Sequence, residues 1–230
     1  MSGEKRLSAD ERRCSIVDAV KKVFADLGFD GTTTRALAKA AGVSEALLYK
    51  HFPSKESLFE AMRDDCLHGP MLEEFKRILE LPSSTSTLVL MVHFLAAKMV
   101  VKSEGDKGFD PVSHALIIRS MLEDGEFAHV MHQQFSKTWT PKFLECVATA
   151  RREGDLAGDE VGADVAAWFA HNLFAMIMLQ LRPKRPVVDY KMDRDELTAS
   201  AVWFCLRGIG LKEKAIQRHY NPKALALLAG

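Results

Sequence analysis

The 230-residue sequence lacks a net charge of either sign, because 31 lysines and arginines balance 31 aspartates and glutamates. No global basic excess attracts nucleic acid, so any DNA-binding surface has to be local. Cysteine is scarce: the 4 residues form no C-x-x-C pair, which argues against a disulfide framework and gives no sign of a zinc site. Residues 1–10 contain no apolar run, so we predict no signal peptide and expect a cytoplasmic protein.

The sequence also has no long apolar run free of polar residues. Its most apolar stretch, residues 161–181, approaches the length of a membrane span. Four polar side chains that are costly in hydrocarbon interrupt it: Asp164, His171, Asn172 and Gln180. We therefore expect a buried or interface helix there and no membrane partner.

Alternation of apolar and polar residues, the signature of β-strands, is missing, whereas apolar residues recur at helical spacing almost throughout. This pattern predicts an all-α fold. The first helix is expected at about 9–27, because Ser8 and Glu11 have the spacing of a capping box and an apolar stripe ends at Gly28.

Two short helices are predicted next, at about 35–41 and 44–51, with Gly42 in the turn between them. A fourth helix begins after Pro53. Two short helices around a glycine turn have the form of a helix-turn-helix, although generic helical hairpins look similar.

Residues 32–59 read TTTRALAKAAGVSEALLYKHFPSKESLF and closely resemble the DNA-binding signature of TetR-family transcriptional regulators. The resemblance is strong over residues 7–61 and weaker beyond them. It implies an N-terminal three-helix DNA-binding unit, residues 1–56, which a fourth helix joins to a larger helical domain for effector binding and dimerisation, residues 57–230. It also implies a regulator rather than an enzyme, in agreement with the absence of nucleophile, metalloprotease, P-loop and dinucleotide motifs. No cofactor is expected.

Recognition helices enter the major groove through their N-terminal part, so the base-contact candidates are Ser44, Glu45, Ala46 and Leu47. The resemblance assigns phosphate contacts to Thr33, Thr34, Tyr49, His51 and Lys55, while Arg35 and Lys50 are assigned to phosphate or base. Basic residues near the N-terminus are expected to add backbone contacts: Lys5, Arg6, Arg12 and Arg13. Taken alone, each of these residues also fits an ordinary surface or packing role.

A lone helix-turn-helix reads few base pairs, so a homodimer on a palindromic double-stranded operator is expected. Apolar helices near 161–181 and 196–210 are the candidates for the dimer interface. The interface residues that we predict are Ala163, Ala167, Trp168, Ala170 and Trp203, and the alternative is that they belong to the core of one chain.

The segment between these parts is rich in methionine and aromatic residues, which adapt to apolar ligands. We predict an effector pocket lined by His93, Phe94, Phe109, Met131, Phe135, Trp139 and Phe143. By resemblance, a small apolar or aromatic effector bound there moves the fourth helix and releases a repressor from DNA. Two alternatives stay open: the same residues form only a core, and the regulator responds to a protein partner or to its own concentration. His129 and His132 share a helix face, but no third metal ligand is near, so no metal site is predicted.

Overall fold

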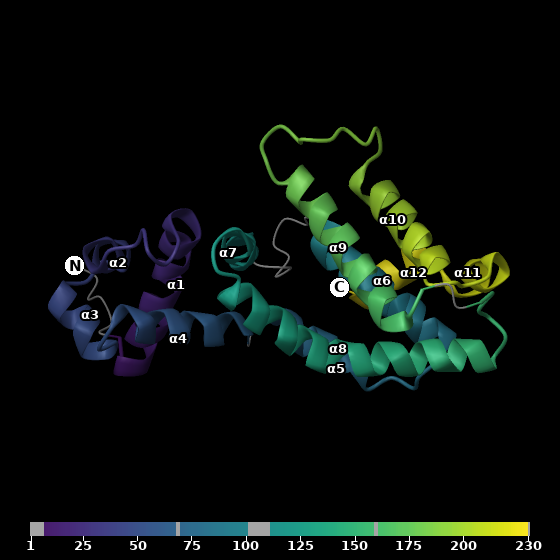
Figure 1. Cartoon of the computed structure of the whole chain (residues 1–230), viewed down its shortest axis with the longest axis horizontal. Coiled ribbons are helices and arrows are strands. Elements are labelled where there is room, and N and C mark those ends of the chain that lie inside the picture. The colour runs from purple at the N-terminus through teal and green to yellow at the C-terminus, as the bar shows by residue number, and fades with distance from the viewer. Residues whose placement is uncertain (1–6, 68–69, 101–110, 159–160, 230) are drawn as a thin grey trace, which may run out of the picture. The chain divides into compact units, whose positions relative to one another are not determined.

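The computed structural model describes residues 7–67, 70–100, 111–158 and 161–229, and most of these are helical (Figure 1). The helices are α1 (Ala9–Leu27), α2 (Thr34–Ala40), α3 (Glu45–His51), α4 (Lys55–Leu67), α5 (Pro70–Leu79), α6 (Thr85–Val100), α7 (Pro111–Leu122), α8 (Glu126–Arg152), α9 (Ala163–Leu181), α10 (Arg194–Gly208), α11 (Glu213–His219) and α12 (Pro222–Ala229). Within the described ranges the only β pairing is an isolated bridge between Leu156 and Leu211. The predicted all-α fold is confirmed.

The helices form two compact units, and each is described by itself. The N-terminal unit contains residues 1–72 and 109–134, so α7 and the first part of α8 pack with α1 to α4. The C-terminal unit contains residues 73–108 and 135–230. The sequence did not reveal that α7 belongs with the N-terminal helices, because its apolar pattern fits packing against any helix. The boundary between residues 56 and 57 stays a prediction.

The first helix begins and ends as its sequence predicts. The Ser8 hydroxyl accepts a hydrogen bond from the Glu11 amide (3.1 Å), and the Glu11 carboxylate accepts one from the Ser8 amide (2.7 Å). The helix ends at Gly28, which adopts a positive φ of 73° that glycine accommodates without strain. Its apolar stripe, including Ile16 and Phe24, lies in the core of the N-terminal unit.

The turn between α2 and α3 depends on Gly42, whose φ is 64°. The Val43 amide donates to the Ala38 carbonyl (3.0 Å) and the Gly42 amide to the Lys39 carbonyl (3.2 Å), which satisfies carbonyls at the end of α2. On α3, Leu48 is buried in the core, and Phe52 is buried directly after the helix. The opposite face of α3 is therefore left for solvent or a partner.

In the C-terminal unit, α6 is the central helix, since it packs against α9, α10, α11 and α12. Its burial on nearly all sides explains its almost uninterrupted apolar sequence. By length and composition, α9 is the one helix in the described part of the chain that could cross a membrane. The side of α9 that packs against α6 and α10 is buried and includes His171, whereas its other side is exposed.

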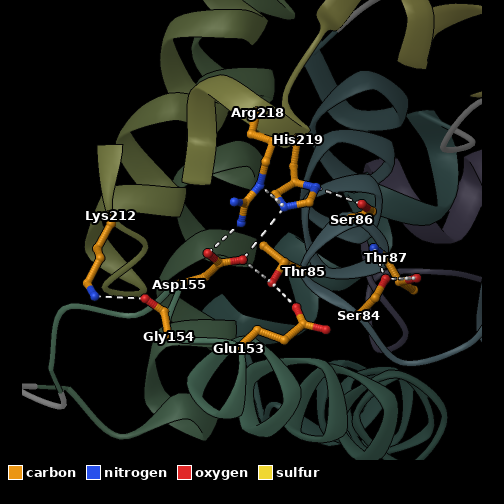
Figure 2. A network of polar contacts seen from close by, with 10 residues as sticks. All are labelled: Ser84, Thr85, Ser86, Thr87, Glu153, Gly154, Asp155, Lys212, Arg218 and His219. Atoms are coloured by element: carbon orange, nitrogen blue, oxygen red, sulfur yellow. Dashed lines mark hydrogen bonds and ion pairs between the residues drawn. The ribbon is translucent and has the colours of Figure 1, made fainter. Parts of the chain in front are cut away.

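Figure 2 shows a polar network that joins the start of α6, the segment after α8 and the end of α11. The buried Asp155 carboxylate accepts hydrogen bonds from the Thr85 hydroxyl (2.8 Å) and the Arg218 guanidinium (2.6 Å). His219 lies 3.6 Å from the same carboxylate, and its other ring nitrogen lies 2.8 Å from the Ser86 hydroxyl. The network closes the C-terminal unit around α6 with charge-assisted hydrogen bonds.

Candidate nucleic-acid interface

The hydroxyl groups at the starts of α2 and α3 occupy N-cap positions. Thr33 accepts a hydrogen bond from the Ala36 amide (3.2 Å), and Ser44 accepts one from the Leu47 amide (3.1 Å). In each case the hydroxyl oxygen accepts, so its own proton is available to a phosphate oxygen. The two helix starts therefore combine a hydroxyl donor, free backbone amides and the positive end of a helix dipole.

Of the predicted DNA-contact residues, Lys5 and Arg6 lie outside the described residues. The others lie on the N-terminal unit, and none of them is buried. Exposed members are Thr33, Arg35, Ser44, Glu45, Ala46, Tyr49 and Lys50, and half-buried members are Thr34, Leu47, His51 and Lys55. The Thr34 hydroxyl lies 3.4 Å from the Glu45 carboxylate, which brings the two helices together at their N-terminal ends. The roles of these residues toward DNA stay predictions.

Lys55 has an internal role that its sequence position did not reveal. Its ammonium group donates to the carbonyls of Phe29 (3.0 Å) and Thr32 (3.3 Å) and lies 4.1 Å from the centroid of the Phe29 ring. These contacts hold the turn that leads into Thr33. An ammonium group has three donors, so one N–H is left for phosphate.

Arg13 is a second such residue. Charge alone suggested a phosphate contact, but its guanidinium donates to the His51 carbonyl at the end of α3 (2.8 Å) and stacks over the Phe52 ring at 4.1 Å. It thereby orients α3 against α1. The spacing between positions 13 and 51 carries no local signal, so only the tertiary structure reveals this contact.

Comparison with known proteins shows which family this chain resembles. The family model described as bacterial regulatory proteins, tetR family, matches residues 16–62, which cover α2, α3 and most of α1 and α4. The nucleoid occlusion factor SlmA of Vibrio campbellii is 32% identical over 143 residues, covering 61% of this chain and 67% of SlmA. The chain belongs to the TetR family.

Other relatives agree with this assignment. The HTH-type transcriptional repressor Rv1474c of Mycobacterium tuberculosis is 26% identical over 67% of this chain and 73% of its own length. The SlmA protein of Marinomonas sp. is matched over about half of its length, 48%. A tetR-family regulatory protein from Rhodococcus RHA1 shares the fold with a TM-score of 0.63 and 18% identity, over 88% of this chain and 99% of that one. TetR-family proteins are DNA-binding transcriptional regulators, so the expectation of a regulator rather than an enzyme is confirmed.

In this TetR-family chain the predicted effector residues are only partly brought together. Ring contacts within the C-terminal unit link Phe94 through Phe75 to Phe135 and onward to Trp139 and Phe143, with centroid separations of 4.6 to 6.3 Å. The ring of Phe135 also lies near Trp168 and His171 of α9. We call Phe75, Phe94, Phe135, Trp139, Phe143, Trp168 and His171 the aromatic cluster.

The other predicted pocket residues lie elsewhere. Met131 packs against the core of the N-terminal unit, and Phe109 lies outside the described residues. His93 is on α6, where its ring faces Tyr220. Burial holds the pKa of His93 below its ordinary value, so the ring is neutral at pH 7.

Trp139 is distinctive within the aromatic cluster. Its side chain is 1% exposed, and among the described residues its indole N–H has no hydrogen-bond acceptor. An unpaired buried donor costs about 1–3 kcal/mol, which a ligand with an acceptor atom at this position would recover.

The proposed dimer helices expose an apolar face. On α9, Val165, Phe169 and Met176 are exposed, and their spacing places them on one side of the helix. Phe204 on the neighbouring α10 is 70% exposed. We call these four residues the α9–α10 face.

Among the predicted interface residues, Ala163, Trp168 and Trp203 are half-buried. Ala167 and Ala170 are buried inside the single chain, because they lie on the side of α9 that packs internally. A pattern of small residues does not tell whether a helix approaches its own chain or another, which is why the sequence did not separate the two sides. Within α9 and α10, the large apolar side chains that are exposed belong to the α9–α10 face.

Proposed function

We propose that this TetR-family protein is a cytoplasmic homodimeric repressor that binds a palindromic operator through α2 and α3. The observation that carries the proposal is the pair of capped helix starts at Thr33 and Ser44, which present hydroxyls and amides beside the exposed Tyr49 and Lys50. These groups match the phosphate backbone, and the small side chains of Ser44 and Ala46 allow the start of α3 to approach base edges.

The plain way to test this proposal is to select bound sequences from random duplex DNA with the full-length protein. We expect an enriched site with two inverted half-sites, because two identical heads related by twofold symmetry read the same sequence on opposite strands. Enrichment of a single half-site, or of no sequence, would contradict a dimeric operator reader.

For the effector, the aromatic cluster and the unpaired Trp139 N–H favour an apolar molecule with a hydrogen-bond acceptor. Two proteins with a similar fold are described in complex with isovaleryl coenzyme A and with stearoyl-CoA, at 18% and 19% identity and TM-scores of 0.61 and 0.55. Both ligands join an apolar acyl chain to a carbonyl acceptor, so they are suitable first probes.

The expected result is release of the selected operator by one of these thioesters. Release should weaken at least tenfold in Trp139→Phe, which keeps the ring but removes the donor. If neither thioester binds, these two acyl-CoA molecules are excluded as effectors. If a thioester releases DNA equally from Trp139→Phe, the indole donor has no part in recognition.

A further inference from the structure

The N-terminal unit contains a hollow of about 220 Å³ that lies on α1, α4, α7 and the start of α8. Its apolar lining is aromatic for the most part: Phe24, Phe29, Phe59, Leu116 and Phe127. The four phenylalanines form one connected group, with ring centroids 5.1 to 6.2 Å apart. This hollow is separate in sequence from the aromatic cluster of the C-terminal unit.

Carboxylates dominate the polar lining of the hollow. They are Glu56, Glu60, Glu123, Asp124 and Glu126, and the basic residues are Arg63 and Arg119. Arg119 is already paired with Glu123 at 2.6 Å, and its two terminal nitrogens each donate to a backbone carbonyl, of Asp26 and of Leu27 (3.4 Å each). The other four carboxylates outnumber two cations: Arg63, which lines the hollow, and Lys55, whose ammonium lies over the Phe29 ring. The lining therefore attracts positive charge.

Two local features indicate which functional groups the ligand carries. Lys55 lies 4.1 Å from the centroid of Phe29, which shows that a ring lining the hollow already attracts a cation. Arg63 has a buried Nε with no acceptor among the described residues. A ligand that fits both features has a flat apolar body, a positive charge and an acceptor oxygen.

We propose that this hollow is a binding site for a small aromatic organic cation, and that its occupancy changes the affinity for DNA. The effect of the ligand on DNA affinity rests on the proposed DNA-binding function. Phe29 lines the hollow, and its carbonyl shares the Lys55 ammonium with Thr32, the residue before the N-cap of α2. A ligand that displaces the Phe29 ring therefore disturbs the support of Thr33.

The test uses three bicyclic probes of similar shape and different charge with the full-length protein. They are the cation 6-methoxy-1-methylquinolinium, the neutral 2-methoxynaphthalene and the anion 6-methoxy-2-naphthoate. Binding is followed by chemical-shift changes in the NMR spectrum. We expect the cation to bind at least tenfold more tightly than the neutral probe and to shift signals of Phe29, Phe59 and Glu60.

Two variants and a control locate the charge effect. Glu60→Gln and Glu126→Gln each remove one carboxylate from the hollow and should weaken the cation about threefold while leaving the neutral probe unchanged. Glu80→Gln removes an exposed carboxylate from the C-terminal unit and should change neither. Equal affinity for all three probes, tighter binding of the anion, or shifts confined to the C-terminal unit would each overturn the assignment.

Operator titration with and without the cation tests the effect on DNA affinity separately. A change in operator affinity of at least fivefold is expected at saturating cation. If the cation occupies the hollow and the affinity stays within twofold, the coupling is wrong and the site stands. If the protein binds no DNA even without a probe, the proposed repressor function fails, while the NMR result still decides the binding site.

Discussion

Residues of the N-terminal unit make both short-range and long-range hydrogen bonds. The caps at Ser8, Thr33 and Ser44 follow from sequence, because a capping side chain contacts an amide only three residues away. The contacts of Arg13 and Lys55 do not follow, because their partners lie 38 and 26 residues away. Sequence spacing thus predicts which residues gather at the surface of α2 and α3, but not which of them also hold the unit together.

Lys50 is the clearest test of a phosphate contact, because it is exposed on α3. A substitution of Lys55 would also remove its hydrogen bonds within the unit. Lys50→Gln should weaken binding to all duplexes about equally and lower the slope of log K against log salt by about one. The measurement is a titration of the selected operator at several salt concentrations. Lys22→Gln on the exposed side of α1 is the matched control and should leave the slope unchanged.

If Lys50→Gln weakened binding to the operator but not to unrelated duplexes, Lys50 would read a base instead of phosphate. An unchanged affinity and slope would exclude Lys50 from the DNA contact altogether.

At the scale of elements, helix limits follow closely from sequence, while helix partners do not. The first helix agrees with its expected range, 9–27, and the turn glycines at 28 and 42 lie at positive φ as their sequence context indicates. The grouping of α7 with α1 was missed, since an apolar stripe identifies a buried face but not the helix that covers it.

The turn between α2 and α3 should be sensitive to a single methyl group. A Cβ at Gly42 would meet no atom within 4 Å, so Gly42→Ala is penalised only by its φ of 64°, at about 1 kcal/mol of unfolding free energy. Gly208→Ala is the control, because that glycine is helical with open space around it, and alanine there should stabilise by about 0.5–1 kcal/mol. Urea unfolding measures both. Equal effects of the two substitutions would show that the positive φ is not a constraint.

The polar network of Figure 2 makes the C-terminal unit sensitive to acid. Burial by itself raises the pKa of the Asp155 carboxyl, but hydrogen bonds from Thr85 and Arg218 outweigh it and hold the pKa below its ordinary value. A lowered carboxyl pKa stabilises the fold above the pKa of the unfolded chain, and the contribution is lost as pH falls through the folded pKa.

Asp155→Asn should therefore lower the free energy of unfolding by about 1–3 kcal/mol at pH 7, and the difference from wild type should shrink as pH falls below 4. Urea unfolding at a series of pH values gives this difference. Glu80→Gln is the control, since that carboxylate is exposed in the same unit and lies outside the polar network. A difference independent of pH would mean that the charge of Asp155 has no part in stability.

At the scale of the whole molecule, the proposed dimer depends on the α9–α10 face. Phe169 and Phe204 are 61% and 70% exposed, and burying a phenylalanine contributes about 1.5–3 kcal/mol. Phe169→Glu should raise the dimer dissociation constant at least tenfold and weaken operator binding with it. Sedimentation velocity over a range of concentrations measures the change.

Leu122→Glu is the matched control, because Leu122 is an exposed apolar residue of the N-terminal unit and is not part of the α9–α10 face. It should leave the dimer intact. If Phe169→Glu also leaves the sedimentation coefficient unchanged, the second copy does not cover this face.

The central claim is that two copies of the protein read inverted half-sites through α2 and α3. Methylation interference on the selected operator tests it most directly, because N7 methylation of guanine alters the major-groove edge that a recognition helix contacts. The account predicts two symmetric sets of interfering guanines, about one helical turn apart, and two protein chains bound to each operator that contains both sets. Interference at one set only, or at none, would contradict it.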